Sequence, residues 1–514
     1  MLEEERKYDV DPSFTVPDLT DCLPEGGSVV AREPKYLRAT YYDTADLLLA
    51  RSGASLRFRR GDTLPWTVKL PTEVPGARHE ISRAGAPGTV PGELIALVTA
   101  YTRGATLKPG AVLRTTRHVY ELRGADGEAL AELDDDAVTV LEGKSVRLAF
   151  REIEVERHAA GRRLLDRVDD RLRSAGATVG AFMPKHVRAL SAIRSDPLGP
   201  AEPAPPAPSL PRKARAGEVV VQAVRAGVGR IVAHDPLVRL REPLPGGDTA
   251  VHQMRVGCRR LRSDLRTFRP LLDPAWVDGL RAELRWLAEA LGHARDAEVL
   301  RARLHATAGT DPLAPLDGAA LGYLDGELVR RHEQALDALD AVLRGDRYRA
   351  LLDRLVAAAA DPPLDSGKAG APAKEVLSRL VSRPWQHLVS GAHGSPGAGA
   401  LDPQAPDGDW HAVRIRAKRA RYAVEAVAGT LGGTAAELGR AVAAVQDLLG
   451  EHQDAAVAAQ TWLALAAGKP DDHALAVTAG RLVERERATV REMRSRFPDA
   501  WRAATRRRLV EWLP

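Results

Sequence analysis

Two segments of the chain carry dense positive charge at helical spacing. In the first, residues 251–270, a histidine and four arginines follow one another at steps of three and four residues: His252, Arg255, Arg259, Arg262 and Arg266. This spacing predicts one basic face of a helix, beside an apolar stripe. The segment holds six arginines and a single acid. Such a face could be merely solvated, or it could bind an anion.

The second segment repeats the first 159 residues later. In "WHAVRIRAKRARYAVEAV" the same steps separate His411, Arg414, Lys418 and Arg421. Each copy is followed by a related stretch, "LGHARDAEVL" at residues 291–300 and "LGEHQDAAVA" at residues 449–458. Solvated surface charge gives no reason for such a repeat, so we infer an internal duplication of a helical unit.

Two such helices facing each other would gather like charges in one groove. This is unfavourable unless an anion neutralises them, so a polyanion is implied. Arginine forks match phosphate oxygens, and lysine adds a point charge. Tyr422 is almost the only aromatic residue in the basic stripes, so nucleic acid is disfavoured for lack of base-stacking platforms. A phosphate polymer without bases fits better.

A different charge pattern occupies the N-terminal region. Glu3, Glu5 and Lys7 alternate in "EEERK", which on a strand puts them on one side. Glu4 and Arg6 lie between them, so a solvated charge run is the alternative. Arg57 and Arg59 alternate in a later segment, as do Glu152, Glu154 and Glu156, and further charged residues lie in the segments between them, at Lys69, Arg78 and Glu80, and Arg114 and Arg117.

A sheet face that is both cationic and anionic suits a closed barrel with a charged interior. Acids in such an interior could hold divalent metal ions through oxygen ligands, and bases could hold phosphates bridged by those ions. The short segments that carry this pattern predict a β-rich N-terminal region.

Chain length and a proline-rich linker indicate the domains that position these residues. The chain has 514 residues and a formal charge of +5, and seven prolines in residues 197–211 indicate an extended linker. We expect an α+β protein: an antiparallel barrel in 1–196, a linker in 197–213 and an all-α region in 214–514, with halves at about 214–358 and 374–514. Isolated Cys22 and Cys258, a charged N-terminus and short apolar runs predict a cytoplasmic protein without membrane spans.

The basic segments resemble the CHAD family of histidine-containing α-helical domains, over residues 215–514. The motif H-x-x-R-x-x-x-[RK]-R-x-R occurs twice, as His252, Arg255, Arg259, Arg260 and Arg262, and as His411, Arg414, Lys418, Arg419 and Arg421. The resemblance implies two pseudo-symmetric four-helix bundles around a basic pore that binds inorganic polyphosphate. The two histidines could contact the anion and respond to pH, or they could cap or pack the helix entry. Neither has the companion ligands of a metal site.

The N-terminal region resembles the CYTH family, the triphosphate tunnel metalloenzymes, over residues 1–194. The E-x-E-x-K start, "YYDT", the R-x-R pair, the E-x-E-x-E segment and "PKHVRAL" carry the likeness. It implies Mg²⁺ or Mn²⁺ held by Glu3, Glu5, Asp134, Glu152, Glu154 and Glu156, with Glu3, Glu5 and Lys7 as catalytic residues. Triphosphate would be held by Lys7, Arg57, Arg59, Lys69, Arg117, Lys185 and Arg188.

These resemblances together predict metal-dependent hydrolysis of inorganic triphosphate or a related triphosphate, in a protein that also binds polyphosphate and associates with polyphosphate granules. The alternative is a polyphosphate-binding protein whose tunnel holds a chain end without cleaving it. The acids discriminate between the two hypotheses, because a pure anion binder has no use for Glu3, Glu5, Glu152 and Glu154 among the bases.

Overall fold

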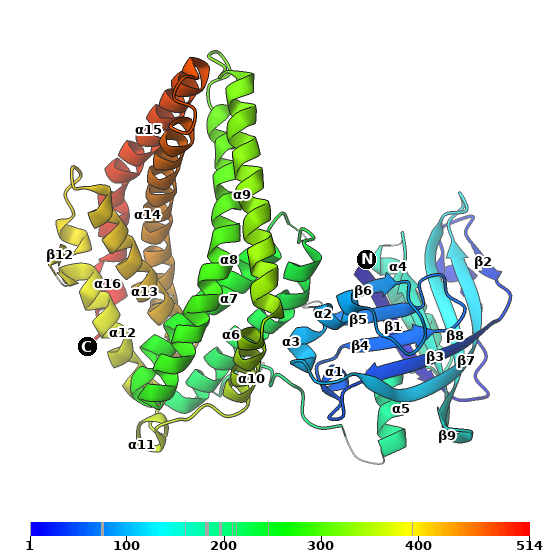
Figure 1. Ribbon diagram of the computed structural model, residues 1–514. Helices are drawn as coiled ribbons and strands as arrows, with labels where there is room; N and C mark the ends of the chain where they lie inside the picture. The colour runs from blue at the N-terminus through cyan, green and yellow to red at the C-terminus, as the bar shows by residue number, and fades with distance from the viewer. Residues whose placement is uncertain are drawn as a thin grey trace. The chain divides into compact units, whose positions relative to one another are not determined.

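The computed structural model describes residues 2–72, 77–159, 161–179, 184–194, 198–207, 209–211, 213–244, 246–392 and 394–514, except for the side chains of Leu2, Glu3 and Ala392. The chain forms two compact units, Met1–Glu202 and Pro203–Pro514. The first is built mainly of strands and the second of helices (Figure 1).

Among the described residues of the first unit, eight antiparallel strands close into a barrel. The order around it is β1, β6, β5, β4, β3, β7, β8 and β9, and β9 pairs with β1 to close the ring. Their bounds are Leu2–Val10 (β1), Lys35–Asp43 (β3), Ser55–Arg59 (β4), Trp66–Pro71 (β5), Ala77–Arg83 (β6), Lys108–Arg123 (β7), Ala129–Glu142 (β8) and Ser145–Arg157 (β9). Outside the ring, β2 (Ser28–Ala31) pairs with β7, and β10 (Thr178–Val179) pairs with β1. The predicted antiparallel barrel is confirmed.

The strand period of two divides this barrel into a charged interior and an apolar exterior. Along β1 and β9, Lys7 pairs in register with Glu154, and the next residue, Tyr8, pairs with Ile153. Lys7 and Glu154 line the interior cavity. Tyr8 and Ile153 belong to an apolar core that also contains the buried leucines of α4 (Arg162–Ser174). Burial of that outer face against α4 fixes the register, because a one-residue slip would bury the charges instead.

Helix α5 (Lys185–Arg194) packs on a second part of the barrel wall. Its Val187, Ala189 and Leu190 share a core with Leu113 of β7 and Val138 of β8. This packing holds the first residue of α5 at the tunnel. Short helices α1 (Leu48–Arg51), α2 (Gly92–Leu97) and α3 (Thr99–Thr102), with a 3₁₀ turn at Thr20–Cys22, complete the unit.

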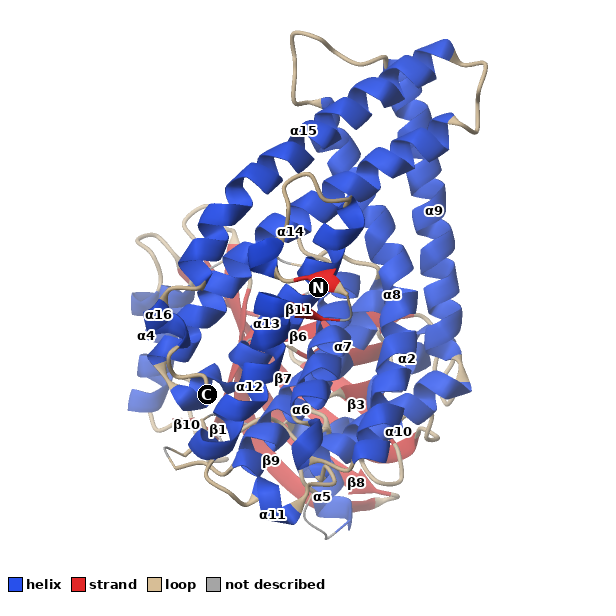
Figure 2. Cartoon of the chain, turned by 90° about the vertical axis from the view of Figure 1, so that its left-hand side faces the viewer, coloured by secondary structure: helices blue, strands red, loops and turns tan. Residues whose placement is uncertain are grey.

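The second unit consists mainly of helices (Figure 2), with one short pair of strands, β11 (Gly391–Ala392) and β12 (Ser395–Pro396), and its long helices form two halves. In one half α6 (Ala216–Leu240), α7 (Ala250–Thr267), α8 (Pro274–Ala308) and α9 (Gly318–Arg344) pack consecutively; in the other, α12 (Ala373–Ser390), α13 (Asp407–Leu431), α14 (Gly433–Ala466) and α15 (His473–Ala504) do so. The remaining helices are α10 (Asp346–Ala360), α11 (Ser366–Ala369) and α16 (Arg507–Val510). The predicted pair of four-helix bundles is confirmed. Helices α7 and α13 contact each other where the halves meet.

The first basic helix, α7, is amphipathic as predicted. Its apolar stripe, which includes Met254, Cys258 and Leu261, is fully buried. The Thr249 side chain accepts a hydrogen bond from the backbone N–H of His252 at 3.2 Å and so caps the helix. Burial of the stripe therefore turns the basic residues toward α13.

In the described parts of the chain, none of the helices combines the length and the apolar character needed to cross a bilayer.

Candidate functional site

The barrel encloses a charged cavity of about 720 Å³. Its basic residues are Lys7, Lys35, Arg57, Arg59, Lys69, Arg78, Arg117 and Lys185, and its acidic residues are Glu5, Asp62, Glu80, Glu132, Asp134, Glu154 and Glu156. Acids and bases from the inward positions of facing strands therefore share one compartment.

Arg117 of β7 contacts three carboxylates in the interior of the barrel. Its guanidinium donates to both oxygens of Asp136, at 2.8 and 2.7 Å, and to Oε2 of Glu154 at 3.1 Å. It also forms an ion pair with Asp134. This bidentate geometry is one that lysine cannot reproduce.

Two lysines complete the network. Lys185 Nζ lies 2.8 Å from Glu154 and 3.2 Å from Glu152, and also pairs with Asp136. Lys7 Nζ lies 3.0 Å from Glu5 and pairs with Glu154. Each lysine therefore contacts more than one carboxylate, and Glu154 is held by both.

These contacts set the ionisation of the tunnel. Burial alone would lower the pKa of Lys7 and Lys185, but neighbouring carboxylates, Glu154 first, hold both pKa values above the ordinary lysine value. Burial raises the pKa of Asp134 to about 7, even though Arg117 opposes this shift. Burial, with Lys7 nearby, lowers the pKa of His186 to about 3, so this lining histidine is neutral.

The tunnel carboxylates have the chemistry of a site for a hard divalent ion. Oxygen ligands are what Mg²⁺ and Mn²⁺ prefer. Oδ1 of Asp134 is buried without a hydrogen-bond partner among the described residues, so one acceptor remains available. Within the part of the chain that the structure describes, no three His, Cys, Asp or Glu side chains form a ready-made metal cluster. Lys185, Lys7 and Arg117 contact the acids instead, so an ion would have to displace these bases.

Most of the predicted tunnel residues line the cavity. Three of them, Glu3, Glu152 and Arg188, are not among its lining residues. The side chain of Glu3 lies outside the described residues, although its backbone pairs with Arg78. Glu152 is buried against Lys185. Arg188 donates to Asp9 at 2.6 Å and lies 3.7 Å from Glu152.

Several charged residues in the interior of the barrel were not predicted from the sequence. Lys35, Glu132 and Asp136 were not anticipated, and Arg78 and Glu80 were noted only as part of the pattern. Glu132, Asp134 and Asp136 occupy alternate positions on β8, but Asp135 lies between the last two and hides the period of two in the sequence. The grouping of Arg114 with Arg117 was wrong: three residues apart on β7, they point to opposite faces, and Arg114 is exposed.

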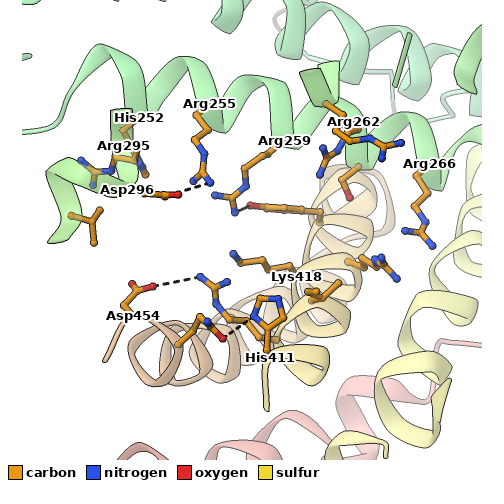
Figure 3. Close-up of a pocket in the computed structure, with 18 of the residues that line it drawn as sticks. His252, Arg255, Arg259, Arg262, Arg266, Arg295, Asp296, His411, Lys418 and Asp454 are labelled. Atoms are coloured by element: carbon orange, nitrogen blue, oxygen red, sulfur yellow. Dashed lines mark hydrogen bonds and ion pairs between the residues drawn. The ribbon is translucent and has the colours of Figure 1, made fainter. Parts of the chain in front are cut away.

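The second candidate site is a basic cavity of about 1030 Å³ between α7 and α13 (Figure 3). The side chains of the two helices point toward each other across it. Its predicted lining residues are His252, Arg255, Arg259, Arg262, His411, Arg414, Lys418 and Arg419, joined by Arg266, Arg281, Arg285 and Arg295, which were not among the expected ligands.

The duplication is visible in matched contacts. Arg255 Nη2 lies 3.8 Å from Asp296, and Arg414 Nη2 lies 3.8 Å from Asp454. In both arginines Nε is buried and has no hydrogen-bond partner among the described residues. Burial lowers the pKa of each below the ordinary arginine value, and the nearby charge of Arg259 lowers both further. Two donors in equivalent positions are thus left for an acceptor such as a phosphate oxygen.

Lys418 has a strongly lowered pKa in this crowded basic cavity. Burial, followed by Arg259 and Arg414, lowers its pKa to about 7. An anion bound beside it would favour the charged form and reverse this shift.

The two histidines differ in their contacts. His411 Nδ1 lies 2.7 Å from Oε1 of Gln453, and an oxygen acceptor at that distance fixes a proton on Nδ1. His252 has its pKa lowered, by burial first and then by Arg295. Both line the cavity, so the anion-contact hypothesis stays open for each.

Two residues of the predicted set lie elsewhere. Arg260 and Arg421 do not line this cavity but an adjoining one of about 1090 Å³, where both contact Glu425. Helical geometry accounts for this, because residues two apart, such as Arg260 and Arg262, point in widely different directions.

A closed barrel with a charged interior, followed by a duplicated helical unit with a basic cavity, defines a two-domain protein of the tunnel and helical-bundle type. The family model of the CYTH domain matches residues 1–174, and that of the CHAD domain matches residues 222–464. The chain belongs to the proteins that join a CYTH domain to a CHAD domain. The CYTH family, as triphosphate tunnel metalloenzymes, implies a triphosphate ligand and a divalent metal for the barrel.

Similar proteins cover most of the chain or somewhat more than half of it. The chain is 32% identical over 487 residues to the uncharacterized protein Rv2226 of Mycobacterium tuberculosis, covering 89% of this chain and 87% of that one. PptA from Streptomyces chartreusis is 26% identical, with a TM-score of 0.44, and covers 56% of this chain and 100% of its own. The CHAD domain from the plant Ricinus communis is 24% identical, with a TM-score of 0.43, and covers 57% and 94%.

Proposed function

We propose that the barrel hydrolyses inorganic triphosphate or a short polyphosphate with Mg²⁺ or Mn²⁺, and that the helical unit binds inorganic polyphosphate. The observation that carries the enzymatic part is the presence of Glu5, Asp134 and Glu154 on the wall of a basic cavity. A site that only held phosphate would be weakened by these acids, because they repel the anion.

Metal binding would fall to the tunnel carboxylates, namely Glu3, Glu5, Asp134, Glu152, Glu154 and Glu156. When bound, the ion would neutralise phosphate oxygens and lower the pKa of a water molecule. The unpartnered Oδ1 of Asp134 supports this assignment.

The bases would hold the substrate and the charge that develops in the reaction. Lys7, with a raised pKa, stays protonated and donates to phosphate oxygens together with Arg57, Arg59, Lys69, Arg117, Lys185 and Arg188. A water oxygen attacks the terminal phosphorus, the bond from that phosphorus to the bridging oxygen breaks, and the protons of the water pass to the phosphate products and to solvent. Triphosphate then yields orthophosphate and pyrophosphate, and the fixed cations stabilise the negative charge on the leaving oxygen.

The helical unit would keep the protein on polyphosphate. Its ligands would be His252, Arg255, Arg259, Arg260, Arg262, His411, Arg414, Lys418, Arg419 and Arg421. Binding there would raise the effective concentration of phosphate chains near the tunnel and would place the protein at polyphosphate granules. The second candidate, a binding protein with an inactive tunnel, would share this part.

Phosphate release from inorganic triphosphate with Mg²⁺ tests the enzymatic part. The double variant Glu5→Gln/Glu154→Gln should lose activity, as should the unaltered protein in EDTA. Glu4→Gln is the matched control, because Glu4 lies next to Glu5 on β1 but pairs with Arg157 and Arg162. Absence of turnover in the unaltered protein with triphosphate, ATP and thiamine triphosphate would leave the binding protein.

Polyphosphate binding is tested separately by titration at several salt concentrations. Arg255→Ala/Arg414→Ala removes the matched pair and should weaken binding and flatten its salt dependence. Exposed Arg440 of α14 provides the control, as Arg440→Ala should change neither.

A further inference from the structure

The basic cavity continues into a second one. Both lie against α7 and α13, and six residues line both, namely His252, Arg259, Arg414, Lys418, Tyr422 and Asp454. We call the first cavity the arginine face and the second, which Arg260, Arg421 and Glu425 also line, the acid-paired face. A phosphate chain bound among the shared residues could in principle extend onto either face.

The internal duplication makes the two faces counterparts. Arg262 and Arg419 line the arginine face, whereas Arg421 and Arg260 line the acid-paired face. Arg421 is the counterpart of Arg262, and Arg419 that of Arg260, at the 159-residue spacing of the repeat. Before the two copies diverged, both faces would have presented the same arginines.

Their charges now differ. The residues that line only the arginine face include seven arginines (Arg255, Arg262, Arg266, Arg281, Arg285, Arg295 and Arg419) and two acids (Asp278 and Asp296). Those that line only the acid-paired face include three arginines (Arg230, Arg260 and Arg421) and four acids (Asp264, Glu425, Asp447 and Glu451).

Glu425 neutralises both duplicated arginines of its face. Its carboxylate accepts from Arg260 Nη1 at 2.7 Å and from Arg421 Nε at 2.6 Å. In the other copy the equivalent position is occupied by Arg266. Among the described residues, Arg262, Arg266 and Arg419 have no acid within ion-pair distance. One position in the repeat, glutamate in one copy and arginine in the other, therefore separates the two faces.

Buried polar atoms without hydrogen-bond partners also distinguish the two faces. Among the described residues that line only the arginine face, the unpartnered buried atom is a donor, Nε of Arg255, while Arg414, whose Nε is also unpartnered, lines both faces. Among those that line only the acid-paired face, the unpartnered atoms are acceptors, Oδ1 of Asp264 and Oε1 of Gln446. Phosphate oxygens can satisfy the former and would be repelled by the latter.

We propose that polyphosphate occupies only the arginine face and that Glu425 excludes it from the other. This inference rests on the proposed polyphosphate binding and narrows it, because it removes Arg260 and Arg421 from the proposed ligands. The arginines of the motif then divide into two roles: Arg262 and Arg419 contact the phosphate chain, while Arg260 and Arg421 hold Glu425 in place.

The duplication supplies a matched experiment in the full-length protein. Titration of polyphosphate chains by calorimetry is compared for Arg262→Ala/Arg419→Ala and Arg260→Ala/Arg421→Ala, two pairs related by the repeat. Each lost arginine–phosphate contact should cost on the order of 10-fold in affinity. The first pair should therefore weaken binding about 100-fold, and the second by less than about 3-fold, because Arg260 and Arg421 touch no phosphate.

A gain of binding tests the role of Glu425 directly. Glu425→Arg restores the residue of the other copy, and with chains short enough to fill one face it should raise the number bound per protein from one to two. Glu425→Gln removes the charge without adding bulk and should tighten binding slightly. Circular dichroism melts of all variants establish that they are folded.

The outcomes distinguish failure of this inference from failure of the proposed polyphosphate binding on which it rests. Equal loss in both double-alanine variants, or an unchanged stoichiometry in Glu425→Arg, would show that the chain uses both faces and would overturn the inference alone. If the unaltered protein bound no polyphosphate, the proposed binding function would fall, and the inference with it.

Discussion

The ammonium group of Lys185 lies 2.8 Å from Oε2 of Glu154 in the tunnel. Lys185 begins α5, and Glu154 lies in the middle of β9. The same lysine reaches Glu152 and Asp136, so a cation from a helix outside the barrel occupies the space among three carboxylates. Metal and lysine should therefore compete for these acids.

We expect Lys185→Gln to bind Mn²⁺ more tightly, by on the order of 10-fold, because the variant removes a competing positive charge from buried carboxylates. The same change should lower turnover of triphosphate, since a phosphate-binding cation is lost. Calorimetric titration of the protein with Mn²⁺ alone measures the first effect. Lys144→Gln, at an exposed turn between β8 and β9, is the control. Unchanged Mn²⁺ affinity would contradict the competition.

The guanidinium fork of Arg117 should be needed as well as its charge. Arg117→Lys keeps the charge but cannot bridge Asp136 and Glu154 as Arg117 does. We expect a loss of about 1–3 kcal/mol in the free energy of unfolding and slower turnover. Arg114→Lys, on the same strand but exposed, should change neither quantity. Denaturant unfolding and phosphate release measure the two effects, and equal behaviour of the two variants would refute the prediction.

Polyphosphate binding should depend on pH through Lys418. Its pKa is about 7 in the free protein, so above pH 7 it is largely neutral. A bound anion raises that pKa, and binding at pH 8 should take up a proton. Affinity should therefore fall as pH rises from 6 to 9. Calorimetry in buffers of different ionisation enthalpy measures the proton uptake.

Lys418→Arg separates this effect from other groups near the cavity. Arginine stays charged throughout this range, so the variant should bind with a flatter pH profile and a smaller proton uptake. Burial raises the pKa of Asp264 to about 7, and His252 is itself one of the six residues that line both cavities. These groups remain in the variant, and an unchanged profile would assign the pH dependence to them.

Periodicity in the sequence was sufficient for the architecture and for much of both sites. Alternation of charge along "EEERK" and "REIEVE" predicted a barrel with a charged interior, because a strand places every second residue on the same side. It did not reveal Asp136, which lies in an unbroken "DDD" run where alternation is hidden. The motif also treated Arg260 and Arg262 alike. The two arginines point in different directions from α7, and Arg260 pairs with Glu425, which lies on the facing helix and outside the motif.

Close packing of α6 against α7 holds the basic helix in position. A Cβ atom added to Gly227 of α6 would lie 2.8 Å from Cβ of Leu261, whose side chain is fully buried in α7. Two residues further along, a Cβ at Gly229 would meet nothing within 4 Å. Helix propensity alone favours alanine at both positions by about 1 kcal/mol. We expect Gly229→Ala to be stabilising or neutral, and Gly227→Ala to lower the free energy of unfolding by about 1–3 kcal/mol through overpacking.

Because the displaced helix carries Arg255 and Arg259, Gly227→Ala should also weaken polyphosphate binding without altering any charge. Denaturant unfolding and calorimetric titration of both variants check the two effects. If Gly227→Ala were as stable as Gly229→Ala, the close approach of α6 and α7 would not be what fixes the position of the basic face. Weakened binding in Gly227→Ala alone would instead show that packing behind α7 sets the spacing of its arginines across the cavity.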